Sequence, residues 1–136
     1  MSSWNDSLLI GVKLIDEQHI ELISRMDQLV DACRHGKGHD EVGETLKFVV
    51  SYVNKHFKDE EELQELYAYP DMAAHKKLHA IFIENTIVLM QDLKTGLCDG
   101  FADRVKTMLI KWFLTHINME DKKVGAYIHK VGGGKH

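Results

Sequence analysis

The sequence predicts an all-α protein, built as an antiparallel up-down-up-down four-helix bundle. Three observations favour this fold. Apolar residues recur at intervals of three and four, the period of one helix face, in four separate segments. Short breaks containing glycine or proline separate these segments, as in bundles of antiparallel neighbours. The 136 residues are 44% hydrophobic and include one proline, which fits one compact domain with a real core.

Composition narrows the classes of function. The formal charge of −4 comes from 17 basic and 21 acidic residues spread along the chain, so no basic patch favours nucleic acid as a partner. The sequence contains neither a signal peptide nor a run of roughly 18 apolar residues, and we therefore expect a cytoplasmic protein without membrane insertion. Cys33 and Cys98 lie far apart without a CxxC motif, which fits reduced thiols, the first in the core and the second in a loop.

The first two predicted helices follow an N-terminal arm of about residues 1–13. The first helix ends at "RHGKGHD", where glycines stop helices, and its apolar stripe consists of Ile15, His19, Leu22, Met26, Leu29 or Val30, and Cys33. The second ends at "YAYPD", where Pro70 suits the first turn of the next helix. Its stripe consists of Val42, Leu46, Val49, Val53, His56, Glu60 and Leu63.

Two further helices complete the predicted bundle. The third ends at "KTGLCDG", and its stripe consists of Met72, His75, His79, Phe82, Thr86, Leu89 and Leu93. The stripe of the fourth consists of Phe101, Val105, Met108, Trp112 and His116, with Met119 beyond. The remaining segment, "KKVGAYIHKVGGGKH", predicts one short extra helix and a frayed tail at about residues 131–136.

Histidines occupy the buried stripes of all four helices. Five of the nine lie on a stripe, namely His19, His56, His75, His79 and His116, whereas loops or the tail are expected to contain His35, His39, His129 and His136. Taken singly, an inward histidine fits a core residue that is hydrogen-bonded to a neighbour. Taken together with Glu60, the five need more partners than neutral networks readily supply, because a buried unpaired carboxylate is costly. A bound metal would satisfy all of them.

The spacing of these residues narrows the chemistry. His56 and Glu60 are four residues apart, as are His75 and His79, so each pair is about 40° apart around its helix and can reach one point on the bundle axis. Asp121 follows His116 by five residues, which an ideal helix places about 140° away. Either the helix widens there, through a π-bulge or a fraying last turn, or this aspartate is a surface acid. A mostly solvated face is expected for Lys58, Asp59, Glu61, Glu62 and Glu65.

Five imidazoles and one or two carboxylates exceed the ligand set of one tetrahedral zinc ion. The sequence also has no thiolate-rich cluster of the kind that binds iron–sulfur groups or structural zinc. Two adjacent borderline metal ions, bridged by the carboxylates, would use the whole set. Two-metal centres hold their ions about 3.5–4 Å apart, a separation that a carboxylate can bridge.

At these residues the sequence resembles the hemerythrins in their prokaryotic, stand-alone form. The resemblance covers nearly the whole chain, so residues 1–136 are taken as a single hemerythrin-like domain. It rests on "DEQH", "HFKDEE", "YPDMAAHKKLHAIF" and "WFLTHINMEDKK", in this order and spacing. It implies two non-haem iron ions with an oxo or hydroxo bridge, which bind dioxygen reversibly.

The resemblance also implies a role for each candidate ligand. By position, His75, His79 and His116 correspond to ligands of one iron, and His19 and His56 to ligands of the other. Glu60 and Asp121 correspond to the bridging carboxylates. If each iron is six-coordinate, as the family implies, the shared oxygen leaves one position open, beside the two-histidine iron. An apolar wall for dioxygen, or ordinary core packing, is expected of Leu22, Trp112, Phe113 and Ile117.

The resemblance therefore implies oxygen storage, transport or delivery to an oxygen-consuming enzyme, or sensing, and not an enzyme. Two alternatives stay open: a di-iron oxidase or peroxidase, and a homeostasis protein that binds iron or nitric oxide. Gln64 and Asn118 depart from the family pattern. Each lies near the site or faces solvent.

Overall fold

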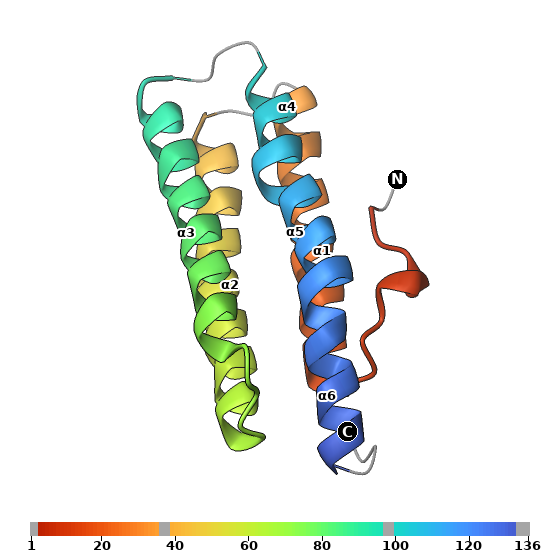
Figure 1. The fold of residues 1–136 in the computed structure, drawn as a ribbon. Helices are drawn as coiled ribbons and strands as arrows, with labels where there is room; N and C mark the ends of the chain where they lie inside the picture. The colour runs from red at the N-terminus through yellow and green to blue at the C-terminus, as the bar shows by residue number, and fades with distance from the viewer. Residues whose placement is uncertain (1–2, 36–38, 97–99, 133–136) are drawn as a thin grey trace.

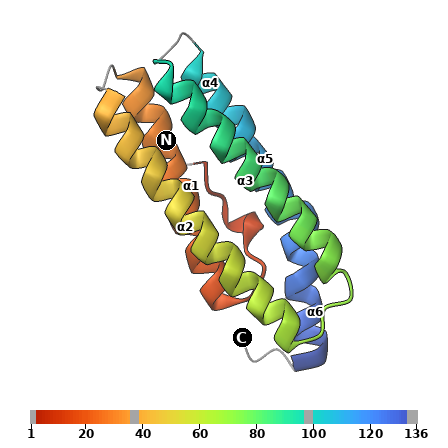
Figure 2. The ribbon, with the colours of Figure 1, turned by 90° about the vertical axis from the view of Figure 1, so that its left-hand side faces the viewer.

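The computed structural model describes residues 3–35, 39–96 and 100–132 of the chain. Four helical rods lie side by side, and consecutive rods run antiparallel (Figures 1 and 2). The first three are α1 (Lys13–Arg34), α2 (His39–Leu66) and α3 (Met72–Lys94). The fourth rod is continuous and consists of α4 (Phe101–Val105), the π-helical η2 (Lys106–Lys111), α5 (Trp112–His116), the π-helical η3 (Ile117–Asp121) and α6 (Lys122–Gly132).

The four rods form a closed ring of neighbours. α1 packs on α2, α2 on α3, α3 on η2 of the fourth rod, and α4 of the fourth rod back on α1. Each rod buries its apolar face toward the common axis, as amphipathic helices do. The predicted all-α four-helix bundle is therefore confirmed. No helix in the described part of the chain is long and apolar enough to span a membrane.

The predicted stripes of α1 and α3 are largely confirmed, and the stripe of α2 is confirmed up to Glu60. At the next position the prediction is wrong, because Gln64 is fully buried and Leu63 is only half-buried. A heptad pattern advances 3.5 residues per turn, whereas a straight helix has 3.6. Over the three heptads from Val42 to Leu63 the mismatch rotates the pattern by about 60°, so the following residue takes the inward position.

The fourth rod departs further from its predicted stripe. Met108 and Trp112 are half-buried, and the fully buried side chains are those of the residues that follow them, Leu109 and Phe113. The π-helical η2 explains the shift, because each of its hydrogen-bonded turns contains one more residue than an α-turn. In α3, Asn85 donates a hydrogen bond from Nδ2 to the carbonyl oxygen of Met108 within η2, at 3.0 Å.

The expected C-terminal extra helix, α6, is a continuation of the fourth rod. His129 therefore lies inside a helix, and His39 begins α2, whereas both were expected in loops or the tail. Of the expected frayed tail, Val131 and Gly132 belong to α6, and residues 133–136, with His136, lie outside the described residues.

The N-terminal arm contacts both α1 and α6, the first and last α-helices of the chain's described part. It contains one short 3₁₀ turn, η1 (Asp6–Leu8), and packs along the fourth rod (Figure 1). The backbone amides of Ile10 and Gly11 donate to the carboxylate of Asp16 in α1, at 2.8 and 3.1 Å. His129 donates from Nε2 to the carbonyl oxygen of Gly11, at 2.8 Å. A Cβ atom at Gly125 would lie 2.2 Å from the carbonyl oxygen of Ile10, so only glycine permits this approach.

Of the two cysteines, one lies within the described residues. Cys33 is half-buried against the core of α1, close to the expected core position. Burial raises the pKa of its thiol. Cys98 lies outside the described residues.

Candidate metal centre

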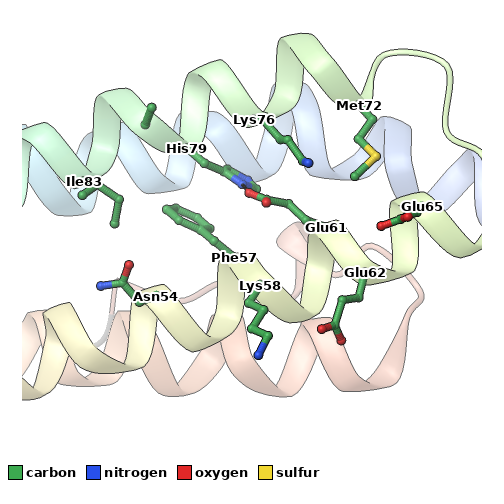
Figure 3. A pocket seen from close by; sticks show the side chains of 11 residues that line it. Asn54, Phe57, Lys58, Glu61, Glu62, Glu65, Met72, Lys76, His79 and Ile83 are labelled. Carbon is green, nitrogen blue, oxygen red and sulfur yellow. Dashed lines mark hydrogen bonds and ion pairs between the residues drawn. The ribbon is translucent and has the colours of Figure 1, made fainter.

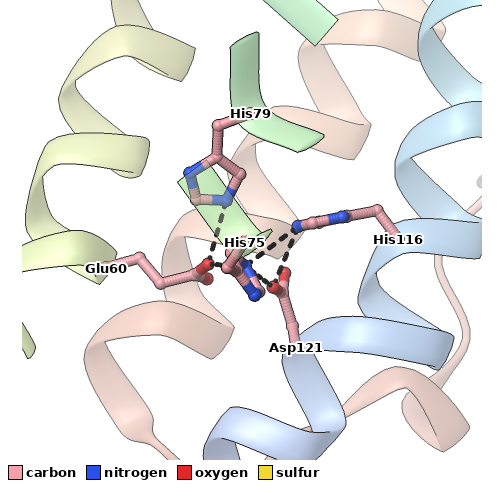
Figure 4. A group of neighbouring side chains, drawn as sticks. All are labelled: Glu60, His75, His79, His116 and Asp121. Atoms are coloured by element: carbon pink, nitrogen blue, oxygen red, sulfur yellow. Dashed lines mark hydrogen bonds and ion pairs between the residues drawn. The ribbon is translucent and has the colours of Figure 1, made fainter. Parts of the chain in front are cut away.

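Seven side chains from all four rods meet in the middle of the apolar core. Their exposed fractions are all below 5%, and they are the seven residues predicted as ligands: His19, His56, Glu60, His75, His79, His116 and Asp121. Figure 4 shows five of them, with the nitrogens of three rings directed at the carboxylates of Glu60 and Asp121. Such a concentration of buried titratable groups is unusual, because each one loses its hydration on burial.

The local helix geometry explains how the residues converge. The two pairs at a spacing of four, His56 with Glu60 and His75 with His79, lie on one face of α2 and α3. The pair at a spacing of five, His116 with Asp121, is brought onto one face by the π-helical η3. Of the two alternatives that the spacing left open, the structure has the widened helix, and Asp121 is fully buried rather than a surface acid.

The carboxylate of Glu60 lies between two groups of histidines. Its Oε1 atom is 2.7 Å from Nε2 of His75 and 3.2 Å from Nε2 of His79. Its Oε2 atom faces the other way, at 3.7 Å from Nε2 of His56 and 3.9 Å from Nε2 of His19. Each oxygen atom of Glu60 therefore faces a different group of histidines.

Asp121 has the same relationship to the two groups. Its Oδ1 atom is 2.9 Å from Nε2 of His75 and 3.1 Å from Nε2 of His116, whereas Oδ2 is 3.0 Å from Nε2 of His19. Two clusters result, both of which contain the two carboxylates, and within each the potential ligand atoms lie within 4.8 Å of one another. One cluster comprises Glu60, His75, His79, His116 and Asp121, and the other His19, His56, Glu60 and Asp121.

Many of these inward-facing atoms lack a hydrogen-bond partner within the described part of the chain. They are Nε2 of His19, His56 and His79, Oε2 of Glu60, and both carboxylate oxygens of Asp121. In addition, Nε2 of His75 and Nε2 of His116 lie 3.2 Å apart, so one proton at most can lie between them. Buried lone pairs that face one another without donors are costly. Metal cations would satisfy them, so the residues fit a metal centre.

The titration behaviour of the cluster also reflects its crowding. Burial, followed by the nearby His19, lowers the pKa of His56 to about 3. Burial opposes the charged form of His75 as well, but the close carboxylates of Asp121 and Glu60 outweigh it and raise the pKa of His75 to about 10. Burial raises the pKa of both carboxylates, and the charge of Asp121 adds to this at Glu60, but the close histidine nitrogens outweigh these effects, so both pKa values are lowered.

Two histidines of the centre have hydrogen bonds on their outer ring nitrogens. His56 donates from Nδ1 to Oε1 of Gln18, at 2.8 Å, and His79 donates from Nδ1 to Oε2 of Glu61, also at 2.8 Å. Glu61 lines a groove of about 440 Å³ between α2 and α3, where its side chain points toward His79 (Figure 3). Such outer contacts orient metal-binding histidines.

The sequence analysis missed these supporting residues. Gln18 was not considered, and Glu61 was expected on the mostly solvated face with Asp59, yet both carboxylates are only about a quarter exposed. Their position in the sequence could have indicated this role, since Gln18 directly precedes His19 and Glu61 directly follows Glu60.

The two aromatic residues of the expected apolar wall lie against different clusters. Leu22, Phe113 and Ile117 are fully buried. The ring of Phe113 lies 5.4 Å from the ring of His19 and 5.9 Å from that of His56, on the two-histidine side. Trp112 instead stacks on His116, with ring centroids 4.9 Å apart, on the three-histidine side.

The two residues that depart from the family pattern have opposite environments. Gln64 is fully buried, and its Nε2 atom lies 3.5 Å from Oε1 of Glu60. Asn118 is exposed on the fourth rod and faces solvent.

Comparison with known proteins assigns the chain to a family. Residues 10–128 match the hemerythrin HHE cation binding domain. A bacteriohemerythrin of Stenotrophomonas maltophilia is 35% identical over 128 residues, covering 94% of this chain and 80% of the relative. A myohemerythrin of Theromyzon tessulatum is 29% identical over 122 residues, 88% of each chain. A crystal structure of wild-type hemerythrin superposes with a TM-score of 0.84 at 26% identity, covering 94% of this chain and 98% of the other. The chain therefore belongs to the hemerythrin family.

Proposed function

We propose that the two clusters bind two non-haem iron ions and that the centre binds dioxygen reversibly. His75, His79 and His116 would be ligands of one ion, and His19 and His56 of the other. The observation that carries this proposal is the placement of Glu60 and Asp121, each of which presents one oxygen atom to each cluster. A single ion would leave one oxygen of each carboxylate buried without a partner.

The unequal size of the clusters supports a vacant position at one ion. One cluster offers five residues and the other offers four. If both ions are six-coordinate and share one solvent-derived oxygen, the first ion is complete and the second has one position left. This position would lie beside His19 and His56, where Phe113 packs against both rings.

The surroundings of that position favour binding of a small neutral gas. Phe113, which packs against His19 and His56, is fully buried and offers no group that could deliver a proton or bind water. Exclusion of water slows proton entry and irreversible oxidation of the bound ions. Five neutral imidazoles with two carboxylates also differ from the carboxylate-rich ligand sets of ferritin-like di-iron proteins. We infer a carrier, store or sensor of dioxygen rather than an oxidase.

The family match over residues 10–128 supports treating the chain as one domain of this kind. Dioxygen is the proposed partner, and an oxygen-consuming enzyme is a second one if the role is delivery. Binding of two iron ions would be needed before the protein could bind dioxygen.

Visible spectroscopy tests the proposed function. The protein is loaded with ferrous iron under argon, and air is then admitted. Charge-transfer bands should develop and then vanish on degassing, through several cycles. Permanent bleaching or permanent oxidation at first exposure would contradict reversible binding. Steady consumption of added hydrogen peroxide without loss of the centre would favour the oxidase or peroxidase alternative.

A single substitution with a matched control tests the ligand assignment. His116→Ala should lower the iron content while the helical content is retained, because the apolar stripes still pack. The control is His35→Ala, since His35 is exposed and its ring bonds only to the carbonyl oxygen of Asp31, as far as the described residues show. Two ions per chain in His116→Ala, as in the control, would contradict the assignment.

A further inference from the structure

The two-histidine cluster is held from outside by a chain of polar contacts that crosses from α1 to α2. We propose that Gln18 is a positioning residue that directs Nε2 of His56 toward the metal, and that Asp59 determines which end of the Gln18 amide faces His56. The proposal rests on the proposed function only in that the centre binds two metal ions.

The contacts form a continuous chain from the centre to the surface. His56 donates from Nδ1 to Oε1 of Gln18, and Gln18 donates from Nε2 to Oδ2 of Asp59, both at 2.8 Å. Lys55 then donates from Nζ to the same oxygen of Asp59, at 3.2 Å. The exposed fraction rises along this series of contacts, from 3% at Gln18 to 25% at the side chain of Asp59 and 62% at that of Lys55.

The chemistry of the three groups fixes their orientation. An ionised carboxylate accepts hydrogen bonds and cannot donate, so Asp59 requires the amide nitrogen of Gln18 on its side. The amide oxygen must then face His56, which can satisfy it only by donating from Nδ1. A histidine with its proton on Nδ1 has a free lone pair on Nε2. Asp59 therefore selects the metal-binding tautomer of His56 through Gln18, although it does not touch the ring.

A neutral amide is also the only kind of side chain that suits position 18. A carboxylate there would face Asp59 at hydrogen-bond distance and repel it. A thioether of the same length would leave both Nδ1 of His56 and one oxygen of Asp59 without this partner. The requirement for a donor on one side and an acceptor on the other is met by an amide that spans both.

The other cluster provides an internal comparison. His79 donates from Nδ1 to the carboxylate of Glu61, a charged acceptor, whereas His56 donates to a neutral one. A charged acceptor makes the ring a stronger electron donor to its metal. In the two-histidine cluster, Nδ1 of His19 has no hydrogen-bond partner among the described residues. Within the described part of the chain, the contact with Gln18 is therefore the only outer hydrogen bond to a ring of this cluster.

Substitutions at position 18 test the proposal through metal binding rather than oxygen binding. Gln18→Met keeps the length of the side chain and removes both hydrogen bonds. The double variant Gln18→Glu with Asp59→Asn restores both bonds with the charge moved next to His56. Glu62→Gln is the control, because Glu62 is an exposed acid of α2 in the groove of Figure 3 and contributes no ring hydrogen bond in the described structure.

Calorimetric titration with Co²⁺ under argon reports each ion separately. We expect Gln18→Met to weaken one of the two binding events about 10- to 100-fold, the usual cost of losing an outer hydrogen bond, while the other event stays within about threefold. The double variant should restore the weakened event. After iron loading it should also have a lower reduction potential than the wild type, which a merely structural role of Gln18 would not produce. Glu62→Gln should match the wild type in both events.

Three results would overturn the proposal. They are unchanged binding of both ions by Gln18→Met, equal weakening of both events, and failure of the double variant to restore the weakened one. Each is distinguishable from failure of the proposed function. A wild-type protein that binds two Co²⁺ ions but gives no reversible oxygen spectrum would reject oxygen carriage alone, whereas unchanged binding by Gln18→Met would reject only the role of Gln18.

Discussion

Nε2 of His116 lies 3.1 Å from Oδ1 of Asp121, although five residues separate them along one helix. The π-helical η3 between them makes this possible, because its wider turn places the fifth residue on the same face. Beyond η3 the rod returns to α-helix and continues for eleven residues. The additional residue in the turn therefore changes which later residues of the rod face the bundle axis, relative to an uninterrupted α-helix.

The first prediction concerns the length of this turn. Deleting Asn118, which is exposed, leaves a spacing of four, which an ordinary α-turn accommodates with about 40° between the two side chains. Inserting an alanine after Asn118 makes a spacing of six, which neither type of turn places on one face. We expect the deletion variant to bind two metal ions per chain and the insertion variant to lose one or both. Metal analysis of both purified variants provides the measurement.

The reverse outcome would contradict this account of η3. If the deletion variant loses metal and the insertion variant keeps it, the face that Asp121 shares with His116 does not determine metal binding. Circular dichroism of both variants controls for loss of the bundle.

The second prediction concerns the buried amide of Gln64. Its Oε1 atom has no hydrogen-bond partner among the described residues, and its Nε2 contact to Glu60 is long, at 3.5 Å. An unsatisfied buried acceptor costs about 1–3 kcal/mol. Gln64→Met keeps the shape and removes this cost, so the metal-free variant should be more stable by roughly 1 kcal/mol. Urea unfolding monitored by circular dichroism gives the free energy.

The exposed Gln91 in α3 offers a matched control. Gln91→Met should change the free energy of unfolding by less than about 0.5 kcal/mol. A loss of stability in Gln64→Met relative to this control would show that the amide has a partner, such as a buried water molecule.

The sequence predicted the histidines and Glu60 because local periodicity determines which face of a helix is buried. In α1 and α3 the rhythm of three and four residues continues to the ends of the helices, so His19, His75 and His79 follow directly from it. In α2 the same rhythm failed only at its end, at Leu63 and Gln64, where the mismatch with 3.6 residues per turn had accumulated.

Two kinds of feature lay beyond single-helix periodicity. The π-turns change the phase of the fourth rod, so spacing alone left the place of Asp121 open, and the resemblance to hemerythrins was needed to favour it as a ligand. Contacts between helices are the other kind. That Gln18 of α1 bonds to His56 of α2 depends on how two rods pack, and neither rod's own pattern contains that information.

The third prediction concerns attachment of the N-terminal arm. Gly125→Ala places a Cβ atom 2.2 Å from the carbonyl oxygen of Ile10, so backbone must move. Overpacking of this kind costs about 1–3 kcal/mol, and we expect a loss of stability in that range. In Gly43→Ala, the control, the new Cβ atom meets only the end of Leu93, at 3.4 Å, and the gain in helix propensity is up to about 1 kcal/mol. Thermal unfolding of both variants compares them. Equal stability of the two would contradict the close contact between α6 and the arm.

The fourth prediction concerns the pH dependence of the metal-free protein. The pKa of His56 is lowered to about 3, so its contribution is complete above its unfolded pKa of about 6.5 and is lost as the pH falls toward 3. The pKa of His75 is raised to about 10, so its contribution is complete below about 6.5 and is lost as the pH rises toward 10. The free energy of unfolding should therefore be highest near pH 6.5 and decrease on both sides.

Metal loading should remove the alkaline decrease and release protons. His75 carries a proton at pH 7 in the metal-free protein and must lose it to bind a metal. Calorimetric titration in two buffers with different ionisation enthalpies counts the protons released. A stability that rises steadily from pH 6.5 to 10 without metal, or metal binding without proton release, would contradict the charge assignment of His75.

The fifth prediction is the number and separation of the metal ions. Iron analysis of protein reconstituted under argon, combined with X-ray absorption spectroscopy, tests most directly whether Glu60 and Asp121 bridge two ions. We expect two iron ions per chain, about 3.5–4 Å apart, as in other two-metal centres. One ion per chain, or two without a neighbouring iron atom in the absorption data, would contradict the bridged centre.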